Sequence, residues 1–213
     1  MNRFEFRTKF GSRGPAVLPV IHVLETARTL RNIDVLVVEG APGCSLINHD
    51  FGVEPFLKIL REVRAARPNL WIAANFLAVT GKDAFPVLAQ LQADDCRIDG
   101  YWADDARIDE KSREQPEAQA IQDARGTWDG MYFGGTAFKK QRPVKEGDFA
   151  AAAKTACDWM DVVCTSGHAT GVEADDTKIA TFREAIGTKP LACLLYTSPS
   201  PRDQRGSRMP SSA

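Results

Sequence analysis

The run Leu70-Trp-Ile-Ala-Ala-Asn-Phe-Leu77 predicts a short buried strand with a helix on each side of it. Before it, Val53–Arg67 carries apolar side chains on one face and charged side chains on the other, as an amphipathic helix does. After it, Phe85, Leu88 and Leu91 recur at helical spacing. A strand placed between two such helices is typical of a parallel sheet covered by helices.

The same pattern recurs along the whole chain. Apolar runs that end in polar clusters begin near Val17, Cys44, Leu70, Arg97, Gly130, Asp161 and Pro190. This regular spacing predicts consecutive βα units and an α/β fold, the (β/α)₈ TIM barrel, which is incomplete here because about seven strands are present. A doubly wound open sheet would share the alternation, but no G-x-G-x-x-G follows the first strand and almost every strand ends in polar residues.

The expected elements follow from apolar periodicity and from turn residues. The strands are expected at Val17–Val23, Cys44–Asn48, Leu70–Leu77, Arg97–Ala103, Gly130–Phe138, Asp161–Thr165 and from Pro190. The helices are expected at Thr26–Gly40, Val53–Arg67, after Asp83 as a cap, Glu114–Ala124, Phe149–Cys157 and Thr177–Ile186, the last ended by Gly187. For the first helix, the buried face is expected to be Ala27, Leu30, Ile33 and Val37.

Composition excludes several functional classes. The 213 residues carry a formal net charge of −1, which offers no basic field for nucleic acid. The five cysteines contain no C-x-x-C pair, and Cys44, Cys164 and Cys193 are expected to be core thiols in a reducing compartment. The sequence contains neither a signal-peptide pattern nor an apolar run long enough for an integral membrane segment, so we expect a cytoplasmic protein. Since H-x-H and H-E-x-x-H are absent, we assign no metal site, and the sequence identifies no particular cofactor.

Polar residues at the ends of six strands give the candidate site, because the active site of a barrel lies at the carboxyl ends of its strands. These residues are His22, Asn48-His49-Asp50, Asn75, Asp104-Asp105, Lys139-Lys140 and Thr165–Gly171.

Proton transfer is the chemistry expected of His22, Asp50 and Asp104. Other roles stay open, because His22 could be hydrogen-bonded within its strand end and Asp50 could cap the following helix. Only one of Asp104 and Asp105 can point inward, since side chains alternate along a strand.

Ligand binding is expected of Asn48, Asn75 and Lys139. Lys139 or Lys140 could pair with a phosphate or carboxylate, or act as a Schiff-base amine, although the doublet also suits a solvated loop. The loop Ser166-Gly-His-Ala-Thr-Gly171 is expected to hold phosphate through free backbone N–H groups at Gly167 and Gly171 and through the hydroxyls of Ser166 and Thr170. A plain turn is the alternative.

Four segments together resemble the BtpA/SgcQ family of TIM-barrel proteins, which is named for a cyanobacterial protein associated with photosystem I assembly. They are Val20–Val23, Asn48–Phe56, Leu70–Phe76 and Asp161–Gly171. The resemblance covers about residues 15–192. It implies a barrel of the ribulose-phosphate-binding type with a phosphorylated sugar or nucleotide-like ligand. It supports as site positions His22, Asn48, Asp50, Asn75, Ser166, Gly167, Thr170 and Gly171.

The chain departs from the family in two places. The first βα loop is reduced to Leu24-Glu25, so substrate contacts from that loop are not expected. After Pro190-Leu-Ala192, the segment that follows resembles a translated adapter sequence of the kind found at the ends of fragmentary metagenomic reading frames. We therefore expect a truncated barrel domain over residues 1–193 and a disordered, non-native tail over 194–213.

Two functions follow from these observations. The first is an enzyme (lyase, isomerase or hydrolase) acting on a small phosphorylated molecule; its full-length parent could form homo-oligomers. The second is a non-catalytic assembly or stability factor for a photosynthetic membrane complex, which should show an apolar patch on its outer helices. In either case we expect this fragment to be inactive and aggregation-prone, because an unclosed barrel leaves two strand edges unpaired.

Overall fold

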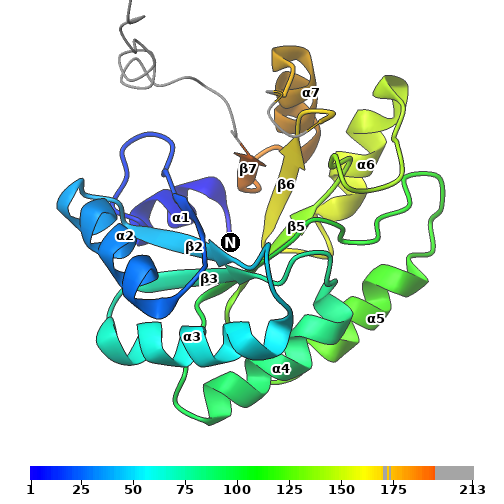
Figure 1. The fold of residues 1–213 in the computed structure, drawn as a ribbon. Coiled ribbons are helices and arrows are strands. Elements are labelled where there is room, and N and C mark those ends of the chain that lie inside the picture. Colours follow the sequence, from blue (N-terminus) through cyan, green and yellow to red (C-terminus); the bar gives the residue numbers. More distant parts are fainter. Residues whose placement is uncertain (170–171, 173, 195–213) are drawn as a thin grey trace, which may run out of the picture.

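A curled parallel sheet forms the centre of the molecule (Figure 1). The computed structural model describes residues 1–169, 172 and 174–194. In sequence order, each strand pairs in parallel with the next. The strands are β1 Val20–His22, β2 Gly43–Ile47, β3 Trp71–Asn75, β4 Gly100–Ala103, β5 Met131–Gly135, β6 Val162–Ser166 and β7 Leu191–Leu194. Thr170, Gly171 and the expected tail beyond Leu194 lie outside the described residues.

Helices follow the strands and form an arc outside the sheet (Figure 1). They are α2 Thr26–Val38, α3 Val53–Ala66, α4 Gly81–Ala93, α5 Pro116–Ala124, α6 Phe149–Ala156 and α7 Asp176–Ile186, with a 3₁₀ turn η1 at Glu146–Asp148. Seven parallel strands that alternate with outer helices confirm the predicted incomplete (β/α)₈ barrel.

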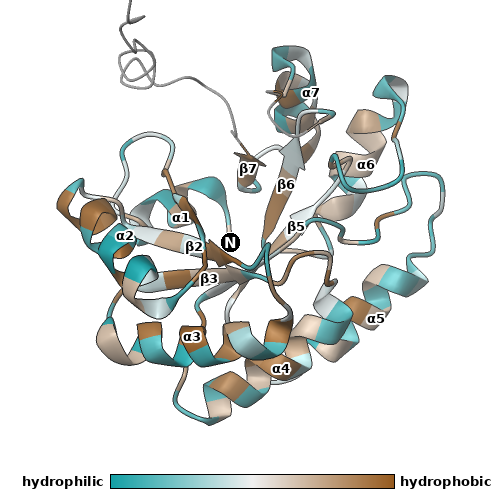
Figure 2. Cartoon of the chain, in the orientation of Figure 1, coloured by the Kyte–Doolittle hydropathy of each residue, from teal (hydrophilic) through white to brown (hydrophobic). Residues whose placement is uncertain are grey.

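The apolar core has two parts because strand side chains alternate between the two faces of the sheet. Figure 2 shows hydrophobic residues along the strands and interspersed with hydrophilic ones along the outer helices. The outer part, between sheet and helices, includes Leu46, Phe56 and Phe85. The inner part lies within the curl and includes Phe133 and Cys164. Polar strand-end side chains on the inward face therefore project into the mouth of the curl.

The βα periodicity does not predict α1, Arg3–Lys9, which precedes the first strand. Asn2 caps this helix by accepting hydrogen bonds from two backbone N–H groups. Two aromatic side chains reach the inner core: the ring of Phe6 lies 6.3 Å from that of Phe133, and the ring of Phe10 lies 5.0 Å from that of Trp71. Since Trp71 begins β3, α1 fills the curl at the amino ends of the strands.

Three details of the predicted elements differ in the structure, and a fourth is confirmed. The first strand is shorter than expected, and Val17 is exposed before it. Thr80, not Asp83, precedes the first residue of α4 and makes no side-chain cap bond; Asp83 lies in the first turn. The predicted face of α2 is wrong at Val37, which is 50% exposed. Gly187 ends α7 as expected, with a φ of +57°.

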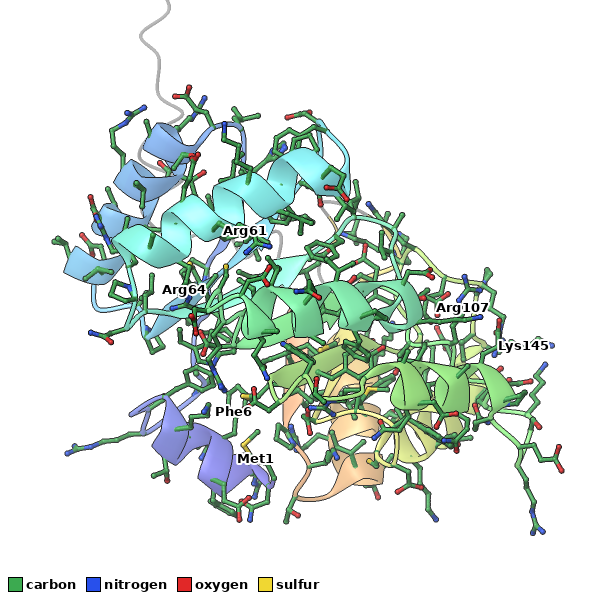
Figure 3. All side chains as sticks on the ribbon, turned by 90° about the horizontal axis from the view of Figure 1, so that it is seen from below. Met1, Phe6, Arg61, Arg64, Arg107 and Lys145 are labelled. Carbon is green, nitrogen blue, oxygen red and sulfur yellow. The ribbon has the colours of Figure 1, made fainter. Side chains whose placement is uncertain are left out.

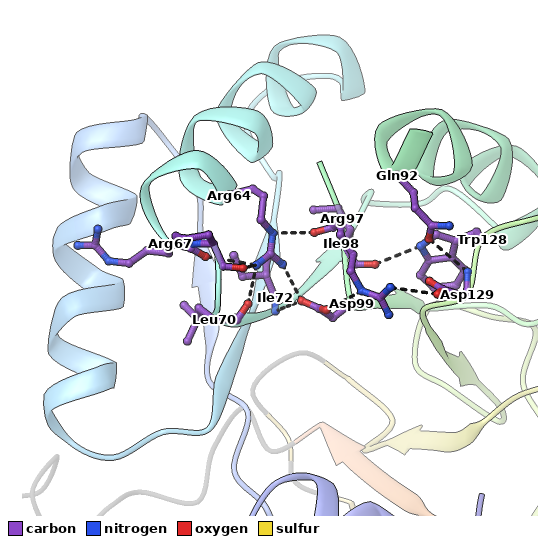
Figure 4. Close-up of polar contacts among 11 residues, drawn as sticks. Arg64, Arg67, Leu70, Ile72, Gln92, Arg97, Ile98, Asp99, Trp128 and Asp129 are labelled. Carbon is purple, nitrogen blue, oxygen red and sulfur yellow. Dashed lines mark hydrogen bonds and ion pairs between the residues drawn. The ribbon is translucent and has the colours of Figure 1, made fainter. Parts of the chain in front are cut away.

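A buried ion pair stabilises the amino ends of β3 and β4 (Figure 4). Arg64 on α3 lies 2.6 Å from an Asp99 carboxylate oxygen and donates hydrogen bonds to the carbonyls of Arg97 and Leu70. The same Asp99 oxygen accepts the Ile72 N–H at 3.0 Å. The guanidinium thus joins the end of its own helix to two neighbouring strands.

A second ion pair repeats this arrangement two βα units later. Arg125, after α5, lies 2.6 Å from Asp161 and donates to the Gly130 carbonyl. Asp161 accepts the Tyr132 N–H at 2.8 Å. In both cases the aspartate directly precedes one strand and binds the backbone of the strand before it. We call these two arrangements the Arg64–Asp99 clamp and the Arg125–Asp161 clamp.

Candidate active site

A cavity of about 80 Å³ opens at the carboxyl ends of the strands. Side chains from six of the seven strands or from the loops after them line it. They are Val20, Ser45, Ile47, His49, Asn75, Trp102, Asp104, Lys139, Lys140 and Leu194. The cavity therefore contains three of the predicted site residues: Asn75, Asp104 and Lys139.

Asp104 is the central acidic group of this cavity. Gly100, Trp102 and Asp104 alternate onto the inward face of β4 and the loop after it. Burial raises the pKa of the Asp104 carboxyl, while a hydrogen bond from Asn75 and the positive charges of nearby lysines act against this increase. The Asn75 amide donates to Asp104 Oδ1 at 3.2 Å. A partly desolvated carboxyl of this kind exchanges a proton closer to neutral pH than an exposed one.

Two residues of the cavity lining each carry a buried polar atom with no hydrogen-bond partner among the described residues: the Asn75 Oδ1 oxygen and the Trp102 Nε1 nitrogen. Both residues line the cavity, and Asn75 is almost completely buried. Because an unpaired buried polar atom costs about 1–3 kcal/mol, such atoms suggest that another molecule supplies the missing bonds. One atom accepts and the other donates, so together they suit a polar ligand.

The loop after β5 carries the two lysines. β5 ends at Gly135, earlier than the predicted Phe138, and the Lys139 N–H donates to Ser166 Oγ at 3.0 Å. Burial lowers the pKa of the Lys139 ammonium; Lys140 lowers it further, and Asp104 opposes both. The loop therefore places positive charge opposite the Asp104 carboxyl.

His22 and Asp50 form a separate pair at the rim. His22 Nε2 lies 3.1 Å from Asp50 Oδ2, and both side chains are about half exposed. The rings of His22 and His49 are 4.4 Å apart. Burial lowers the pKa of His49, as do His22 and Lys140. Gly52, not Asp50, is the N-cap residue of α3, so the alternative role considered for Asp50 is wrong.

Asn48 and Ser166 use their polar atoms within the protein. Asn48 is buried; its amide donates to the Phe51 carbonyl at 2.7 Å and its oxygen accepts the Leu77 N–H at 3.1 Å. Ser166 Oγ donates to the Gly167 carbonyl and accepts the Lys139 N–H. Both residues thus connect loops at the rim, while Thr170 and Gly171, the other half of the expected phosphate loop, lie outside the described residues.

The two adjacent aspartates after β4 differ as predicted. Asp104 lines the cavity, whereas Asp105 pairs with Arg107 at 3.3 Å. The prediction left Trp102, His49 and Lys140 out of the binding set. Strand alternation could have found Trp102, since it shares the inward face with Asp104.

Two features are absent from residues 1–169, 172 and 174–194. Within these ranges, no group of three or more His, Cys, Asp and Glu side chains is placed to hold a metal ion. No helix in these ranges is both long enough and apolar enough to span a membrane.

Several solved structures share this fold. One is the 3,6-anhydro-D-galactonate cycloisomerase from Zobellia galactanivorans, with 14% identity over 87% of this chain and 49% of that one (TM-score 0.56). A second is the dipeptide epimerase from Enterococcus faecalis V583 with Mg and L-Leu-L-Tyr, with 15% identity over 85% and 47% (TM-score 0.54). A third is orotidine 5′-monophosphate decarboxylase from Methanocaldococcus jannaschii with the inhibitor BMP, with 13% identity over 90% and 94% (TM-score 0.52).

These likenesses establish the TIM-barrel fold alone, because every identity is far below 25%. The chain spans about half the length of the cycloisomerase and the epimerase, and nearly all of the decarboxylase. No protein-family model and no curated protein matches the sequence.

Proposed function

We propose that this chain is the core of a TIM-barrel enzyme that transfers a proton on a small phosphorylated molecule, with Asp104 as the acid–base group. The observation that carries the proposal is the partly buried Asp104 carboxyl, which lies in a cavity with Asn75 and two lysines. A carboxyl with a raised pKa can both accept and donate a proton near neutral pH.

Each neighbour has a role in this reaction. Asn75 donates to Asp104 Oδ1 and so orients the carboxyl, while its free oxygen is available to a substrate hydroxyl or amine. Lys139 and Lys140 supply positive charge for a phosphate or for negative charge that develops on a substrate oxygen. The Trp102 indole N–H adds a donor to the same cavity.

The phosphorylated substrate is the finer part of the proposal. It is supported by the resemblance to the BtpA/SgcQ family and by the likeness to a decarboxylase whose name specifies a monophosphate. The loop from Ser166 to Gly171 and the lysine pair are the two candidate phosphate contacts. A lyase, an isomerase and a hydrolase would each use the same proton transfer.

Ligand-dependent thermal stability tests this function. Ribulose 5-phosphate and inorganic phosphate are each titrated against the 213-residue chain, because a ligand that binds only the folded state raises its stability. We expect the melting temperature to rise, and the rise to vanish when Lys139→Ala and Lys140→Ala are combined. Lys145→Ala, at an exposed lysine of the same loop, is the matched control and should retain the response.

A second pair of substitutions separates the phosphate contacts from proton transfer. Ser166→Ala with Thr170→Ala should weaken phosphate binding, whereas Asp104→Asn removes the acid–base carboxyl and should retain phosphate binding. If no phosphorylated compound stabilises the protein at millimolar concentration, the substrate class is wrong.

One observation favours the assembly-factor alternative. The last turns of α2 expose Val35, Val37 and Val38 at 61%, 50% and 84%, and exposed apolar side chains grouped on a helix are typical of an interaction surface. Under this alternative, Val35→Ser with Val38→Ser should abolish association with a partner and leave the response to phosphate unchanged.

A further inference from the structure

Lys178, in the first turn of α7, places its ammonium against two backbone carbonyls at the rim. Its Nζ donates to the Ala137 carbonyl at 2.7 Å and to the Ser166 carbonyl at 2.8 Å. The rings of Phe149 and Phe182 lie 4.9 and 5.9 Å from the same nitrogen. The aromatic rings hold the side chain in place. Two of its three N–H groups bind backbone carbonyls, one in the loop after β5 and one at the end of β6.

The first of these loops needs such a contact. Ala137 has a φ of +47°, in the left-handed region that L-residues other than glycine seldom adopt, and it is buried. This conformation costs about 1–2 kcal/mol and persists only where surrounding contacts hold it. The Thr136 N–H donates to the Cys164 carbonyl at 2.8 Å and fixes the start of the loop. Lys178 then fixes the backbone at Ala137 through the carbonyl of that residue.

The second loop connects this contact to the cavity. Lys178 binds the carbonyl of Ser166, and the hydroxyl of Ser166 accepts the Lys139 N–H at 3.0 Å. Lys139 therefore has its position set from two sides, through Ala137 and through Ser166. Among Lys178, Ala137, Ser166 and Lys139, it is Lys139 that lines the cavity together with Asp104.

We propose that Lys178 is a positioning residue that fixes the backbone at Lys139, and with it the cationic side of the cavity, opposite Asp104. The positioning of Lys139 does not depend on the proposed function. Only its expected effect on ligand binding rests on that function. An aliphatic side chain could fill the space beside the two phenylalanines, but it would leave two buried carbonyls without these donors.

Amide hydrogen exchange tests the positioning without any ligand. Lys178→Met keeps the length and apolar contacts of the side chain and removes its donors. We expect the Lys139 amide to exchange at least about tenfold faster in this variant, while the β2 and β3 amides of Leu46 and Ala74 keep their rates. Lys154→Met, at an exposed lysine on α6, is the matched control and should change none of these rates.

The outcomes separate this proposal from the proposed function. If Lys139 exchanges equally fast in Lys178→Met and Lys154→Met, Lys178 does not position it and the inference is overturned. If Lys139 exchange accelerates but neither variant nor parent binds ribulose 5-phosphate, the positioning stands and the proposed function fails. If both hold, Lys178→Met should also weaken phosphosugar binding about tenfold, and Lys178→Arg should restore part of it.

Should Lys178→Met not fold, Lys178→Gln replaces it in the same measurement, because it retains a neutral donor in place of the ammonium. Unchanged protection of the Lys139 amide in Lys178→Gln would equally overturn the inference. Accelerated exchange there supports it.

Discussion

Charged side chains are paired differently at the amino ends and at the carboxyl ends of the strands. At the amino ends, the Arg64–Asp99 clamp and the Arg125–Asp161 clamp each pair an arginine with an aspartate that also binds a strand N–H. At the carboxyl ends, the Asn75 oxygen and the Trp102 indole nitrogen lack partners among the described residues, and burial raises the pKa of Asp104. The ion pairs at the amino ends stabilise the fold, whereas the partly desolvated Asp104 carboxyl at the carboxyl ends lines a cavity and is available to a ligand.

The difference has a physical cause. A charge held by complete hydrogen bonding stabilises the fold but has no capacity left for chemistry, whereas a desolvated group with an open bond lowers stability and can react. Substitutions at the amino ends should therefore reduce stability, and substitutions at the carboxyl ends should change binding with little loss of stability or with a gain.

The largest effect is expected at Arg64. Arg64→Met leaves the largely buried Asp99 with the more exposed Arg97, at 3.1 Å, as its remaining cation, and it removes the donors to the Arg97 and Leu70 carbonyls. The free energy of unfolding should therefore fall by about 3–5 kcal/mol. Urea denaturation measures this loss. The neighbouring Arg61, also on α3 (Figure 3), pairs with Asp94 at 2.7 Å on the surface. Arg61→Met should cost about 1 kcal/mol or less, and equal losses for the two variants would contradict the comparison.

A smaller loss is expected at the second clamp. Arg125 donates to one backbone carbonyl, that of Gly130, whereas Arg64 donates to four, and the Asp161 side chain is more exposed than that of Asp99. For Arg125→Met, the free energy of unfolding should fall by about 2–3 kcal/mol. Since the two clamps lie two βα units apart and share no residue, the Arg64→Met and Arg125→Met losses should add. A combined loss far from the sum would mean that the clamps are coupled through the sheet.

Much of the fold could be predicted from the sequence, because each strand is a short apolar run and each outer helix has an amphipathic pattern. The first helix, α1, could not, since its only signals are Asn2 as a cap and two phenylalanines that fill the curl. The face of α2 was partly wrong, because Val35, Val37 and Val38 have no partner element among the described residues that would bury them.

The candidate site was predictable in part, for a geometric reason. Asn75, Asp104 and Lys139 follow neighbouring parallel strands, whose carboxyl ends necessarily meet. Nothing in the sequence distinguishes them from Asn48, whose amide and oxygen both bind backbone groups inside the protein. Lys178 lies on a helix rather than at a strand end, so a search of strand ends could not find it.

Asp104→Asn should slightly stabilise the protein at neutral pH. The raised pKa means that the folded state disfavours the ionised carboxyl, so this cost is present above the folded-state pKa and disappears as the pH falls towards the ordinary value of 3.8. We expect a gain of at most about 1 kcal/mol at pH 7 and none near pH 4. Asp105→Asn, which weakens the partly exposed pair with Arg107, should give no such gain. A loss of stability for Asp104→Asn would contradict the proposed cost of burying the ionised carboxyl.

The smallest effect on stability is expected at His22 and Asp50. Their side chains are about half exposed, so His22→Ala or Asp50→Asn should change the free energy of unfolding by less than about 1 kcal/mol. Ligand binding is the informative measurement, because the pair lies beside His49, which lines the cavity. If the pair belongs to the site, either substitution weakens phosphosugar binding without a change in urea midpoint. If binding is unchanged, His22 and Asp50 do not contribute to the site, and the ligand contacts lie within the Asp104 cavity. The contrast between the two ends of the sheet would then hold for the buried and partly buried side chains alone.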